Sequence, residues 1–349
     1  MKTPAFLFPF GTFRGYLFSY GMAGLYGGLT AFGTVMQIIL KRKTFFTIKP
    51  RPTPPACLLD SALGEHRFVQ TKPRPTPPAC LLDSALGEHR FVQTKNVKLH
   101  YVCKGDPQKP LMLFLHGFPE VCLRGYGDSD KPDGVANYAV DKLVDDVRDV
   151  VHALGKEKCI LVSHDWGGLV GWTTAAQYPE LVDKFIVCNA PQIKHFMNAI
   201  ESNWKQFFAS WYIYFFNLPF LPELRFRCND LQVFDYIFKK LGTKEDVEAY
   251  KYYFCRPGAL TAPINYYRAL QRCYGADYLD KIKNKRITSP TLVLWGRDDI
   301  ALTEGLAADS CKSCDNYTIK MIDNCSHWTP FDKPDIVNKY IHEFLDKTK

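Results

Sequence analysis

The sequence has no stripe in which basic and aromatic residues alternate, although its formal net charge is +8. Nucleic-acid-binding domains usually gather their lysines and arginines on one face, so we expect no nucleic-acid partner. The sequence also lacks the closely spaced cysteines of a disulfide framework, because its 12 cysteines are scattered along 349 residues. This spacing is typical of reduced thiols in a protein core, and it weakly favours a cytosolic environment.

Charge is absent from a long segment near the N-terminus, where residues 16–40 contain no Asp, Glu, Lys or Arg. As a helix this segment would be about 37 Å long, enough to cross a hydrocarbon core of about 30 Å. Lys41, Arg42 and Lys43 follow it, and basic residues are fewer before it. The positive-inside rule then places the rest of the chain in the cytosol. We predict a single-pass anchor within residues 1–45 that contacts the bilayer, with the endoplasmic reticulum as the expected membrane.

The segment KPRPTPPACLLDSALGEHRFVQT occurs twice in succession, letter for letter, at residues 49–71 and 72–94. Copies in repeat folds normally diverge, so we interpret the pair as a recent tandem duplication or a gene-prediction artefact. The proline-rich start excludes a helix, whereas EHRFVQT predicts one edge strand. Only one copy can occupy that strand, so we expect the other to be a surface linker and assign residues 46–95 to a linker region.

From residue 96 onward, apolar strand-like runs alternate with helical patterns. The predicted strands are KLHYV (98–102), LMLFLHG (111–117), KCILVSHD (158–165), KFIVCNA (184–190), PTLVLWG (290–296) and TIKMID (318–323). Strands separated by helices predict an α/β fold with a mostly parallel sheet covered on both faces. Aromatic-rich helical sequence at 192–283 divides this core into two parts, 96–191 and 284–349.

The stretch SHDWG at residues 163–167 has the small-x-nucleophile-x-small form of a nucleophile elbow, with Asp165 at its centre. Such a turn lifts the central side chain above the sheet and leaves the next backbone N–H free for an oxyanion. A carboxylate nucleophile attacks saturated carbon, as in an epoxide or a haloalkane, and forms an ester of the enzyme. The structural alternative is an Asp that caps the following helix.

Hydrolysis of that ester needs a histidine oriented by an acid, in the chain order nucleophile, acid, histidine. Asp298 and Asp299 end a predicted strand, and His327 lies in the loop before the last predicted helix. A rival interpretation is zinc, because the same histidine could join three cysteines in a four-ligand site. Those cysteines are Cys311, Cys314 and Cys325. We favour the catalytic interpretation, and expect neither a metal nor a cofactor.

At this point the chain resembles the α/β-hydrolase epoxide hydrolases, in particular the membrane-anchored animal type, from about Pro54 to the C-terminus when one copy of the duplicate is counted. The likeness rests on HGFPE (116–120), RGYGDSDKP (124–132), SHDWGG (163–168), PINYYRAL (263–270), LWGRDD (294–299) and CSHWTPFDKPDIVNK (325–339). It implies the α/β-hydrolase fold with a helical cap at 192–283. It also implies Asp165 as nucleophile, Asp299 rather than Asp298 as the acid, and His327 as base.

The resemblance further implies two cap tyrosines, Tyr212 and Tyr267, which donate hydrogen bonds to the epoxide oxygen; Tyr214 and Tyr266 are near alternatives. It places the oxyanion hole at the N–H groups of Phe118 and Trp166, and substrate contacts at His116, Pro119 and Trp328. The expected substrate is a small apolar epoxide, which water converts to a vicinal diol. HDWGG also occurs in haloalkane dehalogenases, so that activity stays open.

The sequence departs from the family between Glu120 and Arg124, where only three residues stand. Family members carry a helix and a strand there, about twenty residues more. A parallel crossover needs at least about 10–12 residues, so VCL cannot form a parallel neighbour to LMLFLHG. We therefore expect an interrupted sheet, and a catalytically impaired membrane-anchored remnant is the third possible function.

Overall fold

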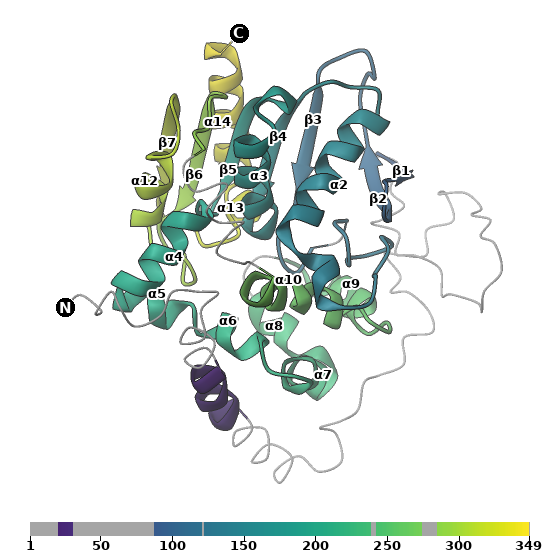
Figure 1. Ribbon diagram of the computed structural model, residues 1–349, viewed down its shortest axis with the longest axis vertical. Helices are drawn as coiled ribbons and strands as arrows, with labels where there is room; N and C mark the ends of the chain where they lie inside the picture. The colour runs from purple at the N-terminus through teal and green to yellow at the C-terminus, as the bar shows by residue number, and fades with distance from the viewer. Residues whose placement is uncertain (1–19, 31–86, 121, 239–241, 274–284, 349) are drawn as a thin grey trace, which may run out of the picture.

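Five parallel strands form the centre of the molecule in the order β3-β4-β5-β6-β7 (Figure 1). Their bounds are β3 Leu111–Leu115, β4 Cys159–His164, β5 Val182–Cys188, β6 Thr291–Gly296 and β7 Tyr317–Ile322. This computed structural model describes residues 20–30, 87–120, 122–238, 242–273 and 285–348. The strands predicted from the sequence are present, with bounds that differ by one or two residues, and the predicted strand KLHYV lies outside this sheet.

Helices cover both faces of this sheet. Successive residues of a strand point to opposite faces, so each strand contacts helices on both sides. On β6, Val293 and Trp295 belong to the core shared with the first group of helices, whereas Leu292 and Leu294 pack against the C-terminal helix. The first group is α2 Val140–Ala153, α3 Asp165–Gln177 and α12 Gly305–Cys311. The opposite face is covered by α14 Pro334–Lys347, which follows the short α13 Thr329–Asp332. Two 3₁₀ turns, η4 Val135–Tyr138 and η5 Pro179–Leu181, precede α2 and β5.

The chain between β5 and β6 forms a layer of helices, which we call the cap (Figure 1). Its members are α4 Ile193–Ser202, α5 Trp204–Ala209, α6 Trp211–Phe216, α7 Leu221–Leu231, α8 Val233–Ile237, α9 Lys244–Phe254 and α10 Thr261–Arg272. Trp166, just after β4, contacts the Tyr267 ring of α10 at 4.9 Å between centroids. The cap therefore lies over the carboxyl ends of the parallel strands.

The sheet is interrupted at the place where the sequence is short. β1 Glu88–Gln93 and β2 Lys98–Cys103 form a separate antiparallel pair, and β3 pairs only with β4 among the described residues. Between β2 and β3 lies a small hollow of about 70 Å³ lined by Leu99, Leu113 and Leu143. Phe114 of β3 is 64 % exposed. The prediction that LMLFLHG lacks a parallel neighbour on one side is confirmed for the part of the chain described.

β1 is formed by the second copy of the duplicate, as an edge strand, which confirms the prediction for EHRFVQT. The first copy lies outside the described residues. Of the predicted membrane anchor, residues 20–30 are described, and they are helical. Within the described ranges, no helix has both the length and the apolarity needed to cross a bilayer.

Candidate active site

Asp165 stands at the turn from β4 into α3 with a backbone φ of +50°. A non-glycine residue rarely adopts this conformation, and here it directs the carboxylate away from the helix axis. The turn also needs small neighbours: a Cβ atom at Gly167 would lie 2.3 Å from the carbonyl oxygen of Leu115. The strained turn and its close packing are the features that the SHDWG pattern predicts.

Both carboxylate oxygens of Asp165 have partners. The backbone N–H of Phe118 donates to Oδ1 at 2.7 Å, and Nε2 of His327 lies 3.3 Å from Oδ2. Burial alone would raise the pKa of Asp165, but the hydrogen bond and charge of His327 outweigh it and hold the pKa below its usual value. Asp165 is therefore ionised at neutral pH, as a nucleophile requires.

His327 connects Asp165 to a second carboxylate. Its Nδ1 lies 2.7 Å from Oδ2 of Asp299, which also accepts from Asn189 Nδ2 at 2.7 Å. Backbone N–H groups of Ala301 and Leu302 donate to Oδ1 of Asp299 at 2.8 and 2.9 Å. Burial alone would raise the pKa of Asp299, but the charge and hydrogen bond of His327 keep it below its usual value.

The pKa of His327 reflects both carboxylates. Burial alone would lower it, but the charge of Asp299 and the hydrogen bonds to Asp165 and Asp299 raise it to about 10. Asp298 is exposed, and its backbone N–H donates to the carbonyl oxygen of Cys325. Of the two neighbouring aspartates, Asp299 is thus the one in contact with the histidine.

Two cap tyrosines, Tyr212 and Tyr267, lie within the electrostatic influence of Asp165. The rings of Tyr212 on α6 and Tyr267 on α10 lie 5.8 Å apart, and Tyr267 packs edge-on against Trp166. Burial, followed by the charge of Asp165, raises the pKa of both phenols far above the usual value. Both phenols are therefore protonated donors.

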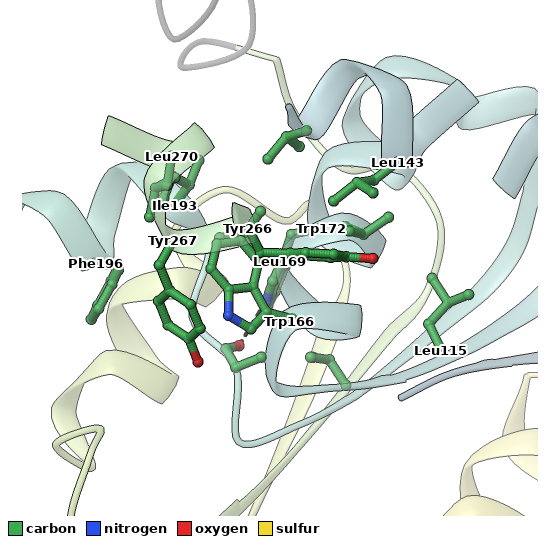
Figure 2. Close-up of a cluster of buried hydrophobic side chains, with 14 of the residues drawn as sticks. Leu115, Leu143, Trp166, Leu169, Trp172, Ile193, Phe196, Tyr266, Tyr267 and Leu270 are labelled. Carbon is green, nitrogen blue, oxygen red and sulfur yellow. Dashed lines mark hydrogen bonds between the residues drawn. The ribbon is translucent and has the colours of Figure 1, made fainter. Parts of the chain in front are cut away.

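The near alternatives, Tyr214 and Tyr266, are placed differently. The hydroxyl of Tyr266 donates to the carbonyl oxygen of Arg124 at 2.6 Å. Figure 2 shows the side chains of Tyr266 and Tyr267 extending from α10 in different directions, with Trp166 between the two rings. Tyr214 is buried beside Phe207 of α5. Geometry thus distinguishes Tyr267 from its neighbour in the sequence.

The remaining residues predicted to contact substrate are His116, Pro119 and Trp328, of which the first two lie in the loop after β3. Nε2 of His116 accepts from the backbone N–H groups of Cys122 and Leu123, each at 2.6 Å, and its Nδ1 lies 2.9 Å from the carbonyl oxygen of Gly117. Burial lowers the pKa of His116 to about 4. His116 is therefore neutral, and its ring holds the short loop after β3 in place by hydrogen bonds to backbone groups of Gly117, Cys122 and Leu123.

Pro119 is buried next to Phe118, and Trp328 packs edge-on against the ring of His327 at 5.3 Å. The indole N–H of Trp328 is buried and has no partner in the described structure. The backbone N–H of Trp166 follows Asp165 directly, at the position that the elbow pattern predicts for an oxyanion donor.

Sequence reasoning did not single out two residues that touch this cluster. Asn189, directly after β5, donates to Asp299 and accepts from the backbone N–H of Gly296 at 2.9 Å. Glu120 accepts from the backbone N–H of Gly117, and burial raises its pKa to about 7. The position of Asn189 at the end of a parallel strand was the available signal, because those ends meet at one edge.

The zinc alternative has no support in the described residues. Both ring nitrogens of His327 face carboxylates, and among those residues no group of three or more potential ligands could hold a metal. Cys311 and Cys314 contact each other, and both are buried.

An elbow aspartate, a histidine–aspartate pair and a parallel sheet together are typical of an α/β hydrolase. A family model described as "alpha/beta hydrolase fold" matches residues 123–334. "Epoxide hydrolase 4" of Homo sapiens is 40 % identical over 326 residues, covering 84 % of this chain and 83 % of the relative. "Epoxide hydrolase 1" of Caenorhabditis elegans is 41 % identical over 283 residues, covering 72 % of this chain and 68 % of the relative.

Solved structures agree with these relatives. The crystal structure of a Bacillus megaterium epoxide hydrolase with an inhibitor superposes with a TM-score of 0.65 at 30 % identity, covering 74 % of this chain and 100 % of the other. A mutant of an epoxide hydrolase from the same organism, crystallised with its diol product, gives a TM-score of 0.67 with the same identity and coverage. The chain belongs to the epoxide hydrolase family of α/β hydrolases.

Proposed function

We propose that this protein hydrolyses apolar epoxides to vicinal diols through a covalent ester of Asp165. The single observation that carries the proposal is the arrangement around this carboxylate, which has the His327–Asp299 pair on one side and the Tyr212–Tyr267 pair on the cap side. One pair supplies a base, and the other supplies acids. Epoxide opening followed by ester hydrolysis needs both.

In the first step an oxygen of Asp165 bonds to an epoxide carbon and the carbon–oxygen bond of the ring breaks. The attacking atom is Oδ2, because its contact with Nε2 of His327, at 3.3 Å, is longer than the 2.7 Å hydrogen bond that Phe118 donates to Oδ1. Tyr212 and Tyr267 donate hydrogen bonds to the developing alkoxide, and one of them transfers its proton. A halide leaving group would need N–H donors instead, so the two phenols favour an epoxide over a haloalkane.

Ester formation prepares the base for the second step. The charge and hydrogen bond of Asp165 help to raise the pKa of His327, and both are lost once the carboxylate is alkylated. The pKa of His327 then falls, so the ring releases its proton, which restores the tyrosine that protonated the alkoxide. The neutral ring can then take a proton from water. The hydroxide attacks the ester carbonyl, and the N–H groups of Phe118 and Trp166 stabilise the oxyanion. The intermediate collapses by breaking the bond between the carbonyl carbon and the substrate oxygen, which takes the proton held by His327. The diol leaves and Asp165 is restored as a carboxylate.

Accumulation of the ester tests this proposal. His327→Gln removes the base but keeps the nucleophile, so a peptide containing Asp165 should gain the mass of the epoxide after one turnover. Asp165→Asn is the matched control and should show no added mass. A His327→Gln variant that releases diol at the parent rate, with no adduct, would contradict the mechanism.

The interrupted sheet favours a second candidate, a catalytically impaired remnant that has kept the site residues. β3 has a free edge in the described structure, and buried unpaired polar groups cost about 1–3 kcal/mol each. Whole-domain stability is only about 5–15 kcal/mol. A purified full chain that binds an epoxide without forming adduct or diol would favour the remnant.

The protein is also proposed to be anchored in the endoplasmic reticulum membrane by residues 16–40, with its catalytic part facing the cytosol. Support comes from the absence of charge in this segment, the basic residues after it and the helix at 20–30. Protease added to intact microsomes should digest the catalytic part, and Asn316 and Asn324, which lie in glycosylation patterns, should carry no glycan. A protected and glycosylated domain would reverse the orientation.

A further inference from the structure

Cys311 and Cys314 take no part in the proposed reaction, yet the backbone holds them close together. Cys311 is the last residue of α12, and the chain turns directly after it. The backbone N–H of Cys314 donates to the carbonyl oxygen of Cys311 at 3.0 Å, which closes a four-residue turn. The Cα atoms at the ends of such a turn are less than about 7 Å apart, which is the upper limit for a disulfide that forms without backbone movement.

The two thiols are buried and in contact with each other. The thiol of Cys311 donates a hydrogen bond to the sulfur of Cys314. This hydrogen bond lowers the pKa of Cys314, against the effect of burial, and raises the pKa of Cys311. The pair therefore consists of one thiol that ionises more readily than usual and one that keeps its proton.

Arg286 adds a positive charge at the same turn. Its guanidinium group donates to the carbonyl oxygens of Lys312 and Cys314, at 3.2 and 2.6 Å. The hydroxyl of Thr291, at the start of β6, and the charge of Arg286 also lower the pKa of Cys314. Thiolates beside a cation are the ones that oxidants attack, whereas thiols in apolar surroundings are inert.

Cys159, the first residue of β4, provides a contrast within the same chain. It is also buried, but burial and the charge of Asp183 raise its pKa to about 12. Burial by itself therefore does not distinguish Cys314 from other cysteines. Lys312 and Asp315, on either side of Cys314, are exposed, so the two sulfurs lie directly below the surface.

We propose that Cys311 and Cys314 form a redox site, in which hydrogen peroxide converts the two thiols to a reversible disulfide. In the first step the thiolate of Cys314 attacks a peroxide oxygen, the oxygen–oxygen bond breaks, and the departing hydroxide takes up the proton that the thiol lost. In the second step the sulfur of Cys311 attacks the sulfenic acid on Cys314, and its proton leaves with the hydroxyl group as water. Two thiols are oxidised, and one peroxide is reduced to two water molecules.

The turn that carries the pair is joined to α4, the first helix of the cap, which lies beside α12 (Figure 1). Oγ of Ser310 accepts from the backbone N–H of Gln192 at 2.9 Å, and Oγ of Ser313 lies 3.0 Å from Nε2 of His195. A disulfide bond is only about 2.05 Å long, so its formation draws the two sulfurs together and shifts the turn between the two serines. The hydrogen bond to Gln192 should weaken, and its backbone N–H should then exchange faster with solvent.

Peptide mapping of the full chain after treatment with hydrogen peroxide tests the site. No epoxide is used, so the result does not depend on the proposed reaction. The treated chain is unfolded, alkylated with iodoacetamide and cut before aspartate, which releases residues 309–314 as one peptide. This peptide should lose two hydrogen atoms and resist alkylation, and dithiothreitol should restore both properties. Cys159 is the matched control and should remain fully alkylated. A fully alkylated 309–314 peptide, or equal oxidation of Cys159, would overturn the proposal.

Single variants test the order of the two steps. In Cys311→Ser the sulfenic acid on Cys314 cannot be resolved, so it should be trapped by dimedone, whereas Cys314→Ser should give no dimedone adduct on Cys311. An adduct on Cys311 and none on Cys314 would overturn the assigned roles. Hydrogen exchange at Gln192 should become faster in the oxidised parent and not in peroxide-treated Cys311→Ser. Unchanged exchange in a fully oxidised parent would overturn the link to the cap.

Discussion

Replacing each cap tyrosine by phenylalanine should slow ester formation, because the alkoxide then loses a hydrogen-bond donor. Tyr212 is partly buried and Tyr267 is buried, their rings are 5.8 Å apart, and burial, followed by the charge of Asp165, favours the protonated form of both phenols. Removing one preorganised donor from such a site costs about 10²–10³-fold in rate, or about 2.7–4 kcal/mol. We expect each single variant to lose that much in the rate of ester formation.

The double variant should lose more than the sum of the two single effects. One remaining phenol can still protonate the alkoxide, whereas no phenol remains when both hydroxyls are removed. Single-turnover mixing, with the adduct on Asp165 measured by mass spectrometry, gives the rate of the first step alone. The KM of the parent reaction does not enter this rate, so binding and chemistry are separated.

Tyr266→Phe is the matched control, because the hydroxyl of Tyr266 donates to the carbonyl oxygen of Arg124 and not to a group at Asp165. It should lower the free energy of unfolding by about 1 kcal/mol and leave the rate of ester formation near that of the parent. Parent-like rates in both Tyr212→Phe and Tyr267→Phe would refute the assignment of the donors. Release of halide from chloroalkanes at a rate comparable to epoxide opening would instead support a dehalogenase.

Three further predictions follow from the site and the sheet. Asp299→Asn should slow ester hydrolysis far more than ester formation in quench-flow measurements, because His327 loses its orienting charge; equal slowing of both steps would contradict this. The pKa of His327 is raised from 6.5 to about 10, so its stabilising effect is complete below pH 6.5 and is lost as the pH rises to 10. The urea midpoint of unfolding should fall over that pH range in the parent and not in His327→Gln. The same pH dependence in both proteins would contradict this prediction. Inserting a family-like helix and strand after Glu120 should raise the urea midpoint and reduce hydrophobic-dye binding, and an unmodified chain of equal stability and activity would disprove the missing-segment argument.

The central parallel strands β4, β5 and β6 were predictable because most of their residues are buried, so they appear in the sequence as continuous apolar runs. β6 has every residue buried, and TLVLWG stands out in the sequence for that reason. The interruption of the sheet was also predictable, since three residues between Glu120 and Arg124 cannot cross from one edge of the sheet to the other. Both inferences depend only on local sequence and chain length.

Other features depend on which side chains meet across the fold, and the sequence does not specify this. His116 was expected at the substrate, whereas its ring nitrogens meet backbone groups of its own loop. Asn189 belongs to no recognisable sequence motif, although its side-chain amide donates a hydrogen bond to Asp299. The contact of Tyr26 with Trp211 joins residues far apart in the chain, and no periodicity predicts it.

The most direct test of the central claim is a single turnover in heavy-oxygen water with enzyme in excess over epoxide. If Asp165 is the nucleophile, the oxygen added to the first diol comes from its carboxylate, so the label should appear in Asp165 and the diol should be unlabelled. Label in the first-turnover diol, with none in Asp165, would mean that water attacks the epoxide directly and would contradict the mechanism.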